Sequence, residues 1–198
     1  MARQAIINGN FDVWQRGTTF TPLDVTFVYG ADRWSDYTGK DGGTLPTISR
    51  TRQILTPGDI ANAFYYSRFT TNGAGTSLGA NSQAKIETRI EHGARLLCGL
   101  NKQVTVSFWA RSDIANKKIG VELVQHYGTG GTPSTAERIS GTNWTLTSTW
   151  TKYTYTFTTN TLVGKTLGTA NNDYLALDIY NMWGTSMASR VGAGSTAE

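Results

Sequence analysis

The chain has 198 residues, with 18 basic and 14 acidic side chains and a formal net charge of +4. This length suits one domain built on one hydrophobic core. The basic residues are spread along the chain and do not form the runs that follow a phosphate backbone, so the sequence does not indicate a nucleic-acid-binding protein.

The chain also offers little for covalent, metal or membrane chemistry. Cys98 is the single cysteine, which excludes an internal disulfide, and two histidines are too few for a zinc cluster. No stretch reaches the length of a membrane span, and the first residues lack the apolar run of a signal peptide. We expect a protein without a cofactor and without a membrane anchor.

The composition predicts an all-β fold. The 22 glycines, 6 tryptophans and 9 tyrosines accompany many threonines, while leucine and alanine rarely recur at helical spacing. Short strands joined by glycine-rich turns are typical of a β-sandwich of two antiparallel sheets.

In the first half of the chain, hydrophobic alternation and turn residues mark out the strands. Asn8-Gly9-Asn10 is a turn signal, and Trp34 is expected to seal one end of the core. A glycine-rich loop covers 71–82, and 92–101 is the one segment with a helical apolar pattern. The predicted strands are 4–7, 27–29, 45–55, 63–70 and 83–91.

The clearest strands lie in the middle, at 103–111 and 118–126. In the first, Val104, Val106, Phe108 and Ala110 alternate with Thr105, Ser107, Trp109 and Arg111. Alternation of this kind puts one set toward the core and the other away from it. We predict that the two segments are antiparallel neighbours in one central sheet.

The second half continues with strands at 138–146, 150–159 and 173–182 after a long loop over 127–140. The sequence gives no sign of a linker between two domains. We therefore assign residues 1–185 to a single β-sandwich and the small, polar segment 186–198 to a C-terminal arm or truncated end.

Two catalytic motifs match in letters and fail in context. Gly75-Thr-Ser77-Leu-Gly79 spells a hydrolase nucleophile elbow, but polar loop residues flank it where a strand and a helix are needed. Gly164-Lys165-Thr166 resembles the end of a phosphate loop, but Thr159 stands where the first glycine belongs. We assign no catalytic residue.

The outward residues of the middle strands suggest a binding surface for sugars. A flat ring packs against the apolar face of a sugar, and charged or amide groups beside it bind the hydroxyls. Glu87 and Arg89 on the strand at 83–91 are expected to join this surface. The predicted carbohydrate-binding residues are Trp109, Arg111, Glu122, His126, Glu87 and Arg89.

Glu87 and Glu122 leave a second interpretation open. Two carboxyls that face each other across a groove can hydrolyse a glycosidic bond. The same residues can instead form surface ion pairs with Arg89 and Arg111, which are common on a solvated sheet face. We expect the ion pairs, and hence a protein that is not an enzyme.

Two groups of segments resemble a known family. Ile7-Asn-Gly-Asn-Phe-Asp-Val-Trp-Gln-Arg-Gly-Thr18, followed by Tyr29-Gly-Ala-Asp-Arg-Trp34, is similar to the start of carbohydrate-binding-module-like domains in bacteriophage tail and head fibre proteins. Val104-Thr-Val-Ser-Phe-Trp-Ala-Arg-Ser112 and the strand that follows Thr149-Trp-Thr-Lys-Tyr-Thr154 resemble a later part of the same domains. The resemblance spans roughly residues 6–182.

The resemblance implies a jelly-roll sandwich, a place in the virion after synthesis in the host cytoplasm, and binding of glycans. Other virion proteins and further copies of the chain, in a trimer, are the expected partners. Some relatives hold structural calcium, for which Asp12 and Asp178 are the candidate ligands. Two alternatives stay open: a structural capsid or fibre decoration protein that binds only virion proteins, and a glycoside hydrolase.

Overall fold

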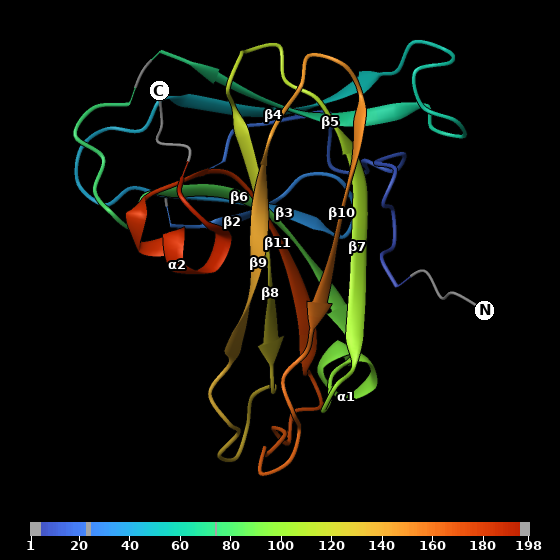
Figure 1. The fold of residues 1–198 in the computed structure, drawn as a ribbon, viewed down its shortest axis with the longest axis vertical. Coiled ribbons are helices and arrows are strands. Elements are labelled where there is room, and N and C mark those ends of the chain that lie inside the picture. Colours follow the sequence, from blue (N-terminus) through green and yellow to red (C-terminus); the bar gives the residue numbers. More distant parts are fainter. Residues whose placement is uncertain (1–4, 23–24, 74, 195–198) are drawn as a thin grey trace.

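The computed structural model describes residues 5–22, 25–73 and 75–194, and it is an all-β sandwich as predicted. Figure 1 shows the strands in two layers, with short helices at the periphery. One layer is a six-stranded antiparallel sheet in the order β2-β3-β6-β11-β8-β9. Its strands are β2 (Phe27–Tyr29), β3 (Trp34–Gly39), β6 (Gln83–Glu91), β11 (Tyr174–Trp183), β8 (Lys118–His126) and β9 (Glu137–Thr145).

The opposite layer is divided into two separate sheets. One is three-stranded, with the order β1-β4-β5, and the other pairs only β10 with β7. In Figure 1, β4 and β5 cross the top of the molecule while β7 and β10 run nearly vertically. These strands are β1 (Thr19–Phe20), β4 (Thr47–Ile54), β5 (Tyr65–Asn72), β7 (Gln103–Ala110) and β10 (Thr151–Thr158).

The predicted strands at 83–91 and 118–126 coincide with β6 and β8, and the helical turn expected within 92–101 is α1 (Gly93–Leu97). The predicted edge strand at 4–7 is wrong over its described residues 5–7, which have no strand conformation. The β7 pattern is confirmed: Val106 is buried, whereas Thr105, Ser107 and Trp109 are exposed.

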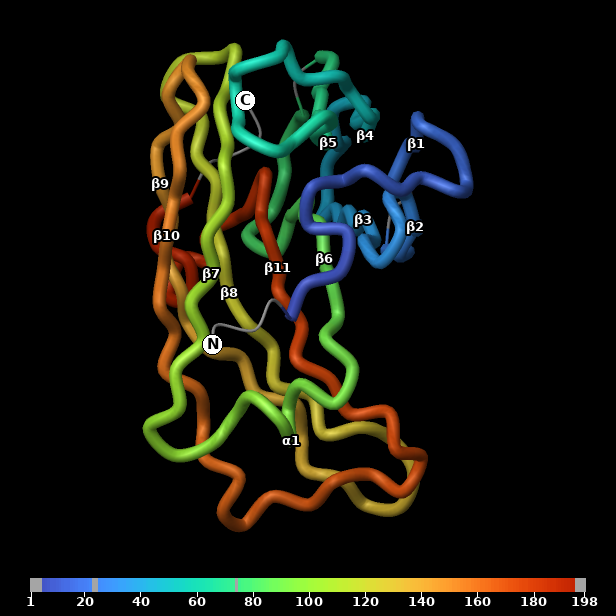
Figure 2. Tube along the Cα trace, turned by 90° about the vertical axis from the view of Figure 1, so that its right-hand side faces the viewer, coloured from blue at the N-terminus to red at the C-terminus, as the bar shows by residue number. Residues whose placement is uncertain are grey.

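The predicted pairing of 103–111 with 118–126 is wrong. β7 pairs along its whole length with β10, so that Trp109 stands opposite Lys152. β8 lies in the other layer, between β11 and β9. In the side view of Figure 2, β7 lies on the left, and β11 and β6 of the other layer lie to its right. Alternation had identified the inward faces of both strands, and these faces meet across the core instead of lying side by side.

The core fills the space between the layers. Trp34 closes it at the N-terminal side, where its ring packs 5.1 Å from that of Phe11. Burial of large aliphatic and aromatic side chains is the main favourable contribution to a fold of this kind. The buried residues of the main cluster are Trp14, Ala31, Trp34, Ile86, Cys98, Val106, Ile119, Val121, Leu123, Ile139, Phe157, Leu175, Leu177 and Ile179.

The segment after β11 differs from the arm that the sequence predicted. A 3₁₀ turn, η1 (Thr185–Met187), leads into the short helix α2 (Ala188–Val191), which lies against the six-stranded sheet in Figure 1. Met187 and Val191 are buried in a cluster with Tyr180 and Trp183. These two apolar residues at helical spacing, together with the Arg190 ion pair to Glu122 at 2.7 Å, dock this otherwise small and polar segment. Residues 195–198 lie outside the described residues.

Within the described ranges, neither α-helix has the length and apolar character that crossing a bilayer requires.

Val191→Asp tests whether this docked segment belongs to the folded body. Val191 is fully buried, so an aspartate there places a carboxyl group without a partner among rings. We expect a loss of about 3 kcal/mol of unfolding free energy, or roughly 6–12 °C in Tm for a chain of this size. Thermal unfolding followed by circular dichroism measures it.

Ser189→Asp is the matched control, because Ser189 is exposed on the same helix. It should change the unfolding free energy by less than about 0.5 kcal/mol. Equal, small effects of both substitutions would show that 185–191 is a loosely attached arm.

Candidate functional site

The six predicted sugar-binding residues fall on two separate surfaces. Trp109 and Arg111 stand at the end of β7, on the divided layer. Glu87, Arg89, Glu122 and His126 stand on β6 and β8, in the six-stranded sheet. The prediction of one shared polar face is wrong, because β7 and β8 belong to different layers.

The first surface borders a cleft of about 1090 Å³ that runs between β5 and β7. Consecutive residues of both strands line it, from Tyr65 to Thr71 and from Gln103 to Asp113. Side chains of a strand alternate between faces, so an uninterrupted run means that the cleft follows the strand edges themselves. Both edges are unpaired because β5 and β7 end their respective sheets. The floor consists of inward residues of the six-stranded sheet, including Ile86, Leu177 and Ile179.

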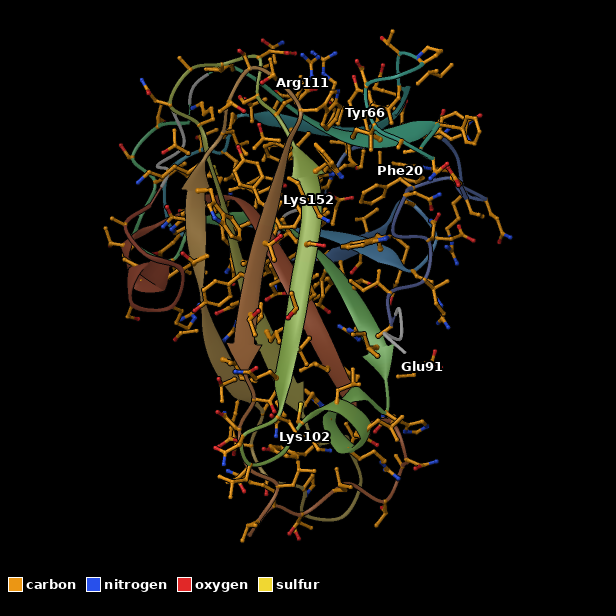
Figure 3. All side chains as sticks on the ribbon, turned by 45° about the vertical axis from the view of Figure 1, so that its right-hand side comes forward. Phe20, Tyr66, Glu91, Lys102, Arg111 and Lys152 are labelled. Atoms are coloured by element: carbon orange, nitrogen blue, oxygen red, sulfur yellow. The ribbon has the colours of Figure 1, made fainter. Side chains whose placement is uncertain are left out.

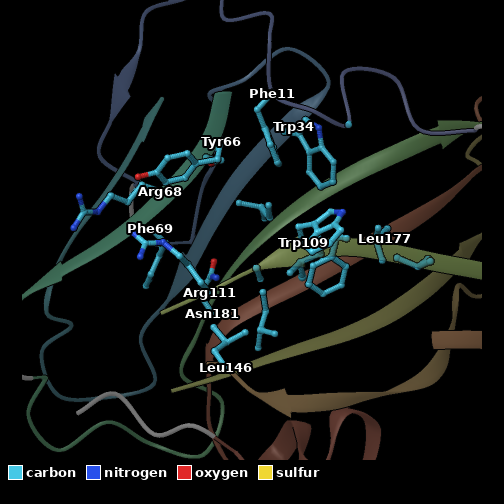
Figure 4. Close-up of a pocket in the computed structure, with 18 of the residues that line it drawn as sticks. Phe11, Trp34, Tyr66, Arg68, Phe69, Trp109, Arg111, Leu146, Leu177 and Asn181 are labelled. Atoms are coloured by element: carbon cyan, nitrogen blue, oxygen red, sulfur yellow. The ribbon is translucent and has the colours of Figure 1, made fainter. Parts of the chain in front are cut away.

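Aromatic rings gather at the mouth of this cleft. The Tyr66 ring on β5 meets the Trp150 ring edge-on at a centroid distance of 5.1 Å. The guanidinium of Arg111 lies 5.6 Å from the centroid of the same Trp150 ring. Trp109, two residues before Arg111, is 45% exposed. Figure 4 shows Tyr66 on one side of the pocket and Trp109 on the other. Rings from both sheets therefore frame one opening.

Charged groups complete the mouth. Asp113, in the loop after β7, receives Arg68 on one carboxylate oxygen at 3.2 Å and Arg111 on the other at 3.3 Å. Arg68 comes from β5, so this carboxylate bridges the two sheets across the opening. We call the set Tyr66, Arg68, Trp109, Arg111, Asp113 and Trp150 the cleft-mouth cluster.

The second surface is the outer face of the six-stranded sheet, and it carries a row of carboxylates. Asp178 on β11 stands directly opposite Glu87 on β6 and Glu122 on β8. Their side chains are almost completely buried, with exposed fractions of 6% for Glu87 and 0% for the other two. Like charges on adjacent strands repel one another unless cations neutralise them.

Four cations surround this row. Lys85 lies 2.6 Å from Asp178 and 3.3 Å from Glu87. Arg89 pairs with Glu87 at 2.6 Å. On the other side, Glu122 accepts hydrogen bonds from Arg138, from Arg190 of α2 at 2.7 Å and from the Tyr180 hydroxyl at 2.6 Å. The helix that covers this face thus supplies one of its counter-charges.

A bulge in β9 shapes the contact with Glu122. Val121 stands opposite Thr142 and Leu123 opposite Ile139, so that Ser140 and Gly141 together face Glu122. A Cβ atom on Gly141 would lie 1.9 Å from the Val121 carbonyl oxygen. Only glycine permits this close approach of two backbones.

The pKa values of the two coupled carboxyls move apart. Burial raises the pKa of Asp178 to about 7, against the opposing effect of Lys85 and with the help of the Glu87 charge. The pKa of Glu87 is lowered: burial acts to raise it, but the charges and hydrogen bonds of Lys85 and Arg89 outweigh that effect. Asp178 therefore keeps its proton most readily, while Glu87 stays ionised.

His126 belongs to a different part of this face. Its ring stacks on Tyr174 of β11 with a centroid distance of 4.4 Å, and the guanidinium of Arg89 lies 4.6 Å from the centroid of the Tyr174 ring. Burial and the nearby Arg89 lower the pKa of His126. A smaller cavity of about 350 Å³ opens beside them, lined among others by Tyr29, Glu87, Arg89 and Tyr174.

The candidate calcium ligands have other contacts. Asp178 pairs with Lys85, and Asp12 accepts a hydrogen bond from the side-chain amide of Asn10. Among the described residues, no group of three or more His, Cys, Asp or Glu side chains is placed to hold a metal ion. Calcium binding by Asp12 or Asp178 stays a prediction.

Several residues of the cleft-mouth cluster were missed by sequence reasoning. Tyr66, Arg68, Asp113 and Trp150 come from three chain segments that meet only in the folded molecule. A local signal existed for Trp150, which directly precedes the regular strand β10, but none for Arg68. The exposed positions on β5 could not be connected with β7 because the two strands do not pair.

The fold and these surfaces define an all-β sandwich with an open cleft between the two sheets of its divided layer, β1-β4-β5 and β10-β7. No family model and no curated protein matches the chain. Among solved structures it is similar to the enzymatically active domain of bacteriophage CBA120 tailspike protein 4, with 12% identity and a TM-score of 0.42. The match covers 77% of this chain and 18% of that one, so the chain spans less than a fifth of its length.

This comparison corrects one expectation. The sequence led us to expect that the protein is not an enzyme, but the tailspike domain in this match is described as enzymatically active. That expectation is withdrawn. A likeness of this extent does not itself assign an activity, a ligand or a location to the chain.

Asp178→Asn tests the buried carboxylate row through pH. A pKa raised on folding means that the folded state binds the Asp178 proton more tightly than the unfolded state, whose aspartates titrate near 3.9. The stability from this proton is present at acidic pH and is lost as pH rises through about 7. We expect wild-type Tm to contain a component that falls between about pH 4 and about pH 7, and the variant to lack it.

Thermal unfolding at half-unit pH steps measures this difference. Glu91→Gln is the control, since the side chain of Glu91 is 70% exposed and pairs at the surface with Arg33. An Asp178→Asn profile that runs parallel to wild type over this range would mean that Asp178 is ionised throughout.

Proposed function

We propose that the chain is a bacteriophage virion domain that binds glycans in the cleft between β5 and β7. The observation that carries this proposal is the cleft-mouth cluster, where an exposed tryptophan and two further rings stand beside arginines and a carboxylate. The resemblance of the Asn10 to Gly17 segment to phage fibre domains supports the virion location.

The chemistry of the cluster suits a sugar ring. Trp109 offers a flat apolar face for the C–H groups of the sugar, and Arg68, Arg111 and Asp113 offer donors and acceptors for its hydroxyls. The cleft volume of about 1090 Å³ lies just above the usual range for ligand sites, so it has room for more than one sugar unit. Of the six residues predicted from sequence, Trp109 and Arg111 remain in this proposed site.

The other four contribute unequally. Glu122 is fully buried beneath Arg138, Arg190 and Tyr180, so in this arrangement a ligand has no access to it. Arg89, Glu87 and His126 border or approach the smaller cavity on the opposite face. We keep these three as a proposed secondary contact and do not place them in the cleft.

Trp109→Ala tests the proposed cleft site. Removing the ring eliminates the stacking surface while leaving the inward side of β7 untouched. We expect glycan affinity to fall by about 2 kcal/mol, or roughly 30-fold, as for a central aromatic contact. A glycan array identifies the bound sugars, and calorimetry with the best binder gives the loss.

Phe64→Ala is the control, because Phe64 is an aromatic residue with 69% exposure that does not line the cleft. Its affinity and the Tm of both variants should match wild type. If Trp109→Ala binds as well as wild type, the cleft is not the site. If wild type binds no glycan and instead assembles with other virion proteins or with itself as a trimer, the structural alternative replaces this function.

Hydrolysis of the glycan is the second candidate function, and the opposite pKa shifts of Asp178 and Glu87 favour it. A carboxyl that retains its proton near neutral pH beside an ionised one is the pairing that general acid catalysis uses. Arg89 and Arg138 cover this row, and their side chains are 40% and 45% exposed. Substrate would reach the carboxyls only after these two side chains move aside.

An assay of released reducing ends tests this candidate on the polysaccharides that the array identifies. If the row is catalytic, Asp178→Asn and Glu87→Gln should each lower the rate by at least about 100-fold, the usual contribution of an acid or base. The row and the cleft lie on opposite faces of the six-stranded sheet, so Trp109→Ala should leave the rate of a reaction catalysed by the row unchanged. Activity that survives both carboxyl substitutions would exclude the row as the catalytic centre.

A further inference from the structure

We propose that the glycan bound in the cleft is acidic and that Arg68 and Arg111 together bind its carboxylate groups. This inference rests on the proposed glycan-binding function and names the class of sugar. Three observations support it: the basic lining of the cleft, the position of the Asp113 carboxylate between the two arginines, and the exposure of these ion pairs to water.

The lining of the cleft is strongly basic. Asp113 is the one acidic side chain among the described residues that line it, and the basic ones outnumber it five to one. Arg50 is neutralised by Asp36 at 2.7 Å inside the protein, and Lys118 donates a hydrogen bond to the Ala193 carbonyl oxygen at 3.0 Å. At the mouth, Arg68 and Arg111 share the single carboxylate of Asp113, which leaves one positive charge in excess there. The basic lining residues are Arg50, Arg68, Arg111, Lys117 and Lys118.

A further cation adjoins the tryptophan. Lys152 on β10 stands directly opposite Trp109 on β7 and is exposed. Side chains at opposite positions of an antiparallel pair are within contact distance. Figure 3 shows Lys152 and Arg111 in the upper part of the molecule, with Tyr66 close to Arg111 on the separate strand β5. A sugar stacked on Trp109 would therefore have cations on two sides.

Asp113 shows how a carboxylate fits between the two arginines. Its two oxygens lie 3.2 Å from Arg68 and 3.3 Å from Arg111, so each arginine takes one oxygen. A guanidinium has five N–H donors in a planar fork that matches a carboxylate. Each arginine uses Nη2 for Asp113, and Arg111 also donates through Nη1 to the Ser148 carbonyl oxygen at 3.4 Å. The remaining N–H donors of both guanidinium groups can bind a second carboxylate. Arg111 is also held over the Trp150 ring, so its orientation is fixed before a ligand arrives.

Asp113 can give way to a ligand because its ion pairs are exposed. The side chains of Asp113, Arg68 and Arg111 are 54%, 47% and 36% exposed. Exposed pairs of this kind contribute little to stability, since water screens the charges and the long side chains lose freedom. A sugar carboxylate can therefore share or replace these contacts without a large loss to the fold. A neutral sugar would leave the excess positive charge of the cleft unused.

The test is an array of matched glycan pairs, in which each acidic sugar has a neutral partner made by esterifying or reducing its carboxylate. Wild type should bind the acidic members at least roughly tenfold more tightly, the effect of losing charge-assisted hydrogen bonds. Arg68→Gln with Arg111→Gln should remove this preference. Asp113→Asn should increase binding of acidic members, because it removes a competing anion.

Arg16→Gln with Lys102→Gln is the control for overall charge. It removes the same number of positive charges as the arginine variant, and both residues are exposed and line neither the cleft nor the smaller cavity. Figure 3 shows Lys102 at the far end of β7 from Arg111. This variant should keep the preference within about twofold, because exposed charges separated by more than a Debye length are screened.

The outcomes separate the two proposals. Equal binding of acidic and neutral members would overturn the acidic class and leave glycan binding intact. The array also carries sulfated sugars without a carboxylate, and binding of these members alone would overturn the carboxylate in favour of another anion. Binding of no member by wild type would overturn the glycan-binding function itself. An equal loss in the control variant would mean that net charge, and not the two arginines, sets the preference.

Discussion

The interruption between β5 and β7 is the constraint on which the rest of this structure depends. A continuous back layer would cover the inward face of the six-stranded sheet completely. Here β4 and β5 cross the top at a steep angle to β7 and β10, so the layer cannot pair across the junction. Unpaired strand edges are usually covered or made unattractive to other strands. In this molecule arginines and aromatic rings occupy the opening.

The charged groups are buried on the outer face of the six-stranded sheet and exposed at the mouth of the cleft. On the outer face of the six-stranded sheet, Glu87, Asp178 and Glu122 are withdrawn from water and matched by cations from three directions. A buried ion pair returns little net stability, but removing one partner is costly because the other charge stays buried. The arrangement ties helix α2 to the sheet through Arg190, which explains why the last described segment is ordered against the body.

Sequence reasoning succeeded where a property repeats locally. Period-two alternation gave the inward and outward sides of β7, and it gave the bounds of β6 and β8. It could not give neighbours, because a strand looks the same whichever strand it pairs with. The partner of β7 is β10, more than 40 residues later, and β11 separates β6 from β8. The sequence therefore put Glu87 and Glu122 on one outward surface but gave no sign that Asp178 of β11 lies between them.

The burial of the Glu122 carboxylate could not be predicted from the sequence either. Glu122 alternates with apolar residues in a pattern that normally faces water, and its sequence neighbours give no sign of Arg138, Tyr180 and Arg190 closing over it. The same limit applied to Arg68, whose importance depends on Asp113 from a distant loop. In both cases the decisive fact is a contact between segments far apart in the chain.

The contrast between these two sets of charges bears on where a ligand can bind. A charged side chain can bind a ligand strongly only if it is not already held in a strong ion pair inside the protein. The carboxylates of the six-stranded sheet have their cations within 2.6–3.3 Å and almost no exposure, so a ligand would have to break strong pairs to use them. Arg68 and Arg111 share one exposed carboxylate at 3.2–3.3 Å. Because exposed pairs are weak, these arginines retain most of their capacity to bind an anion. The buried carboxylate row carries more charge than the cleft-mouth cluster, but its charges are already paired. The charges of the cleft-mouth cluster remain available to a ligand.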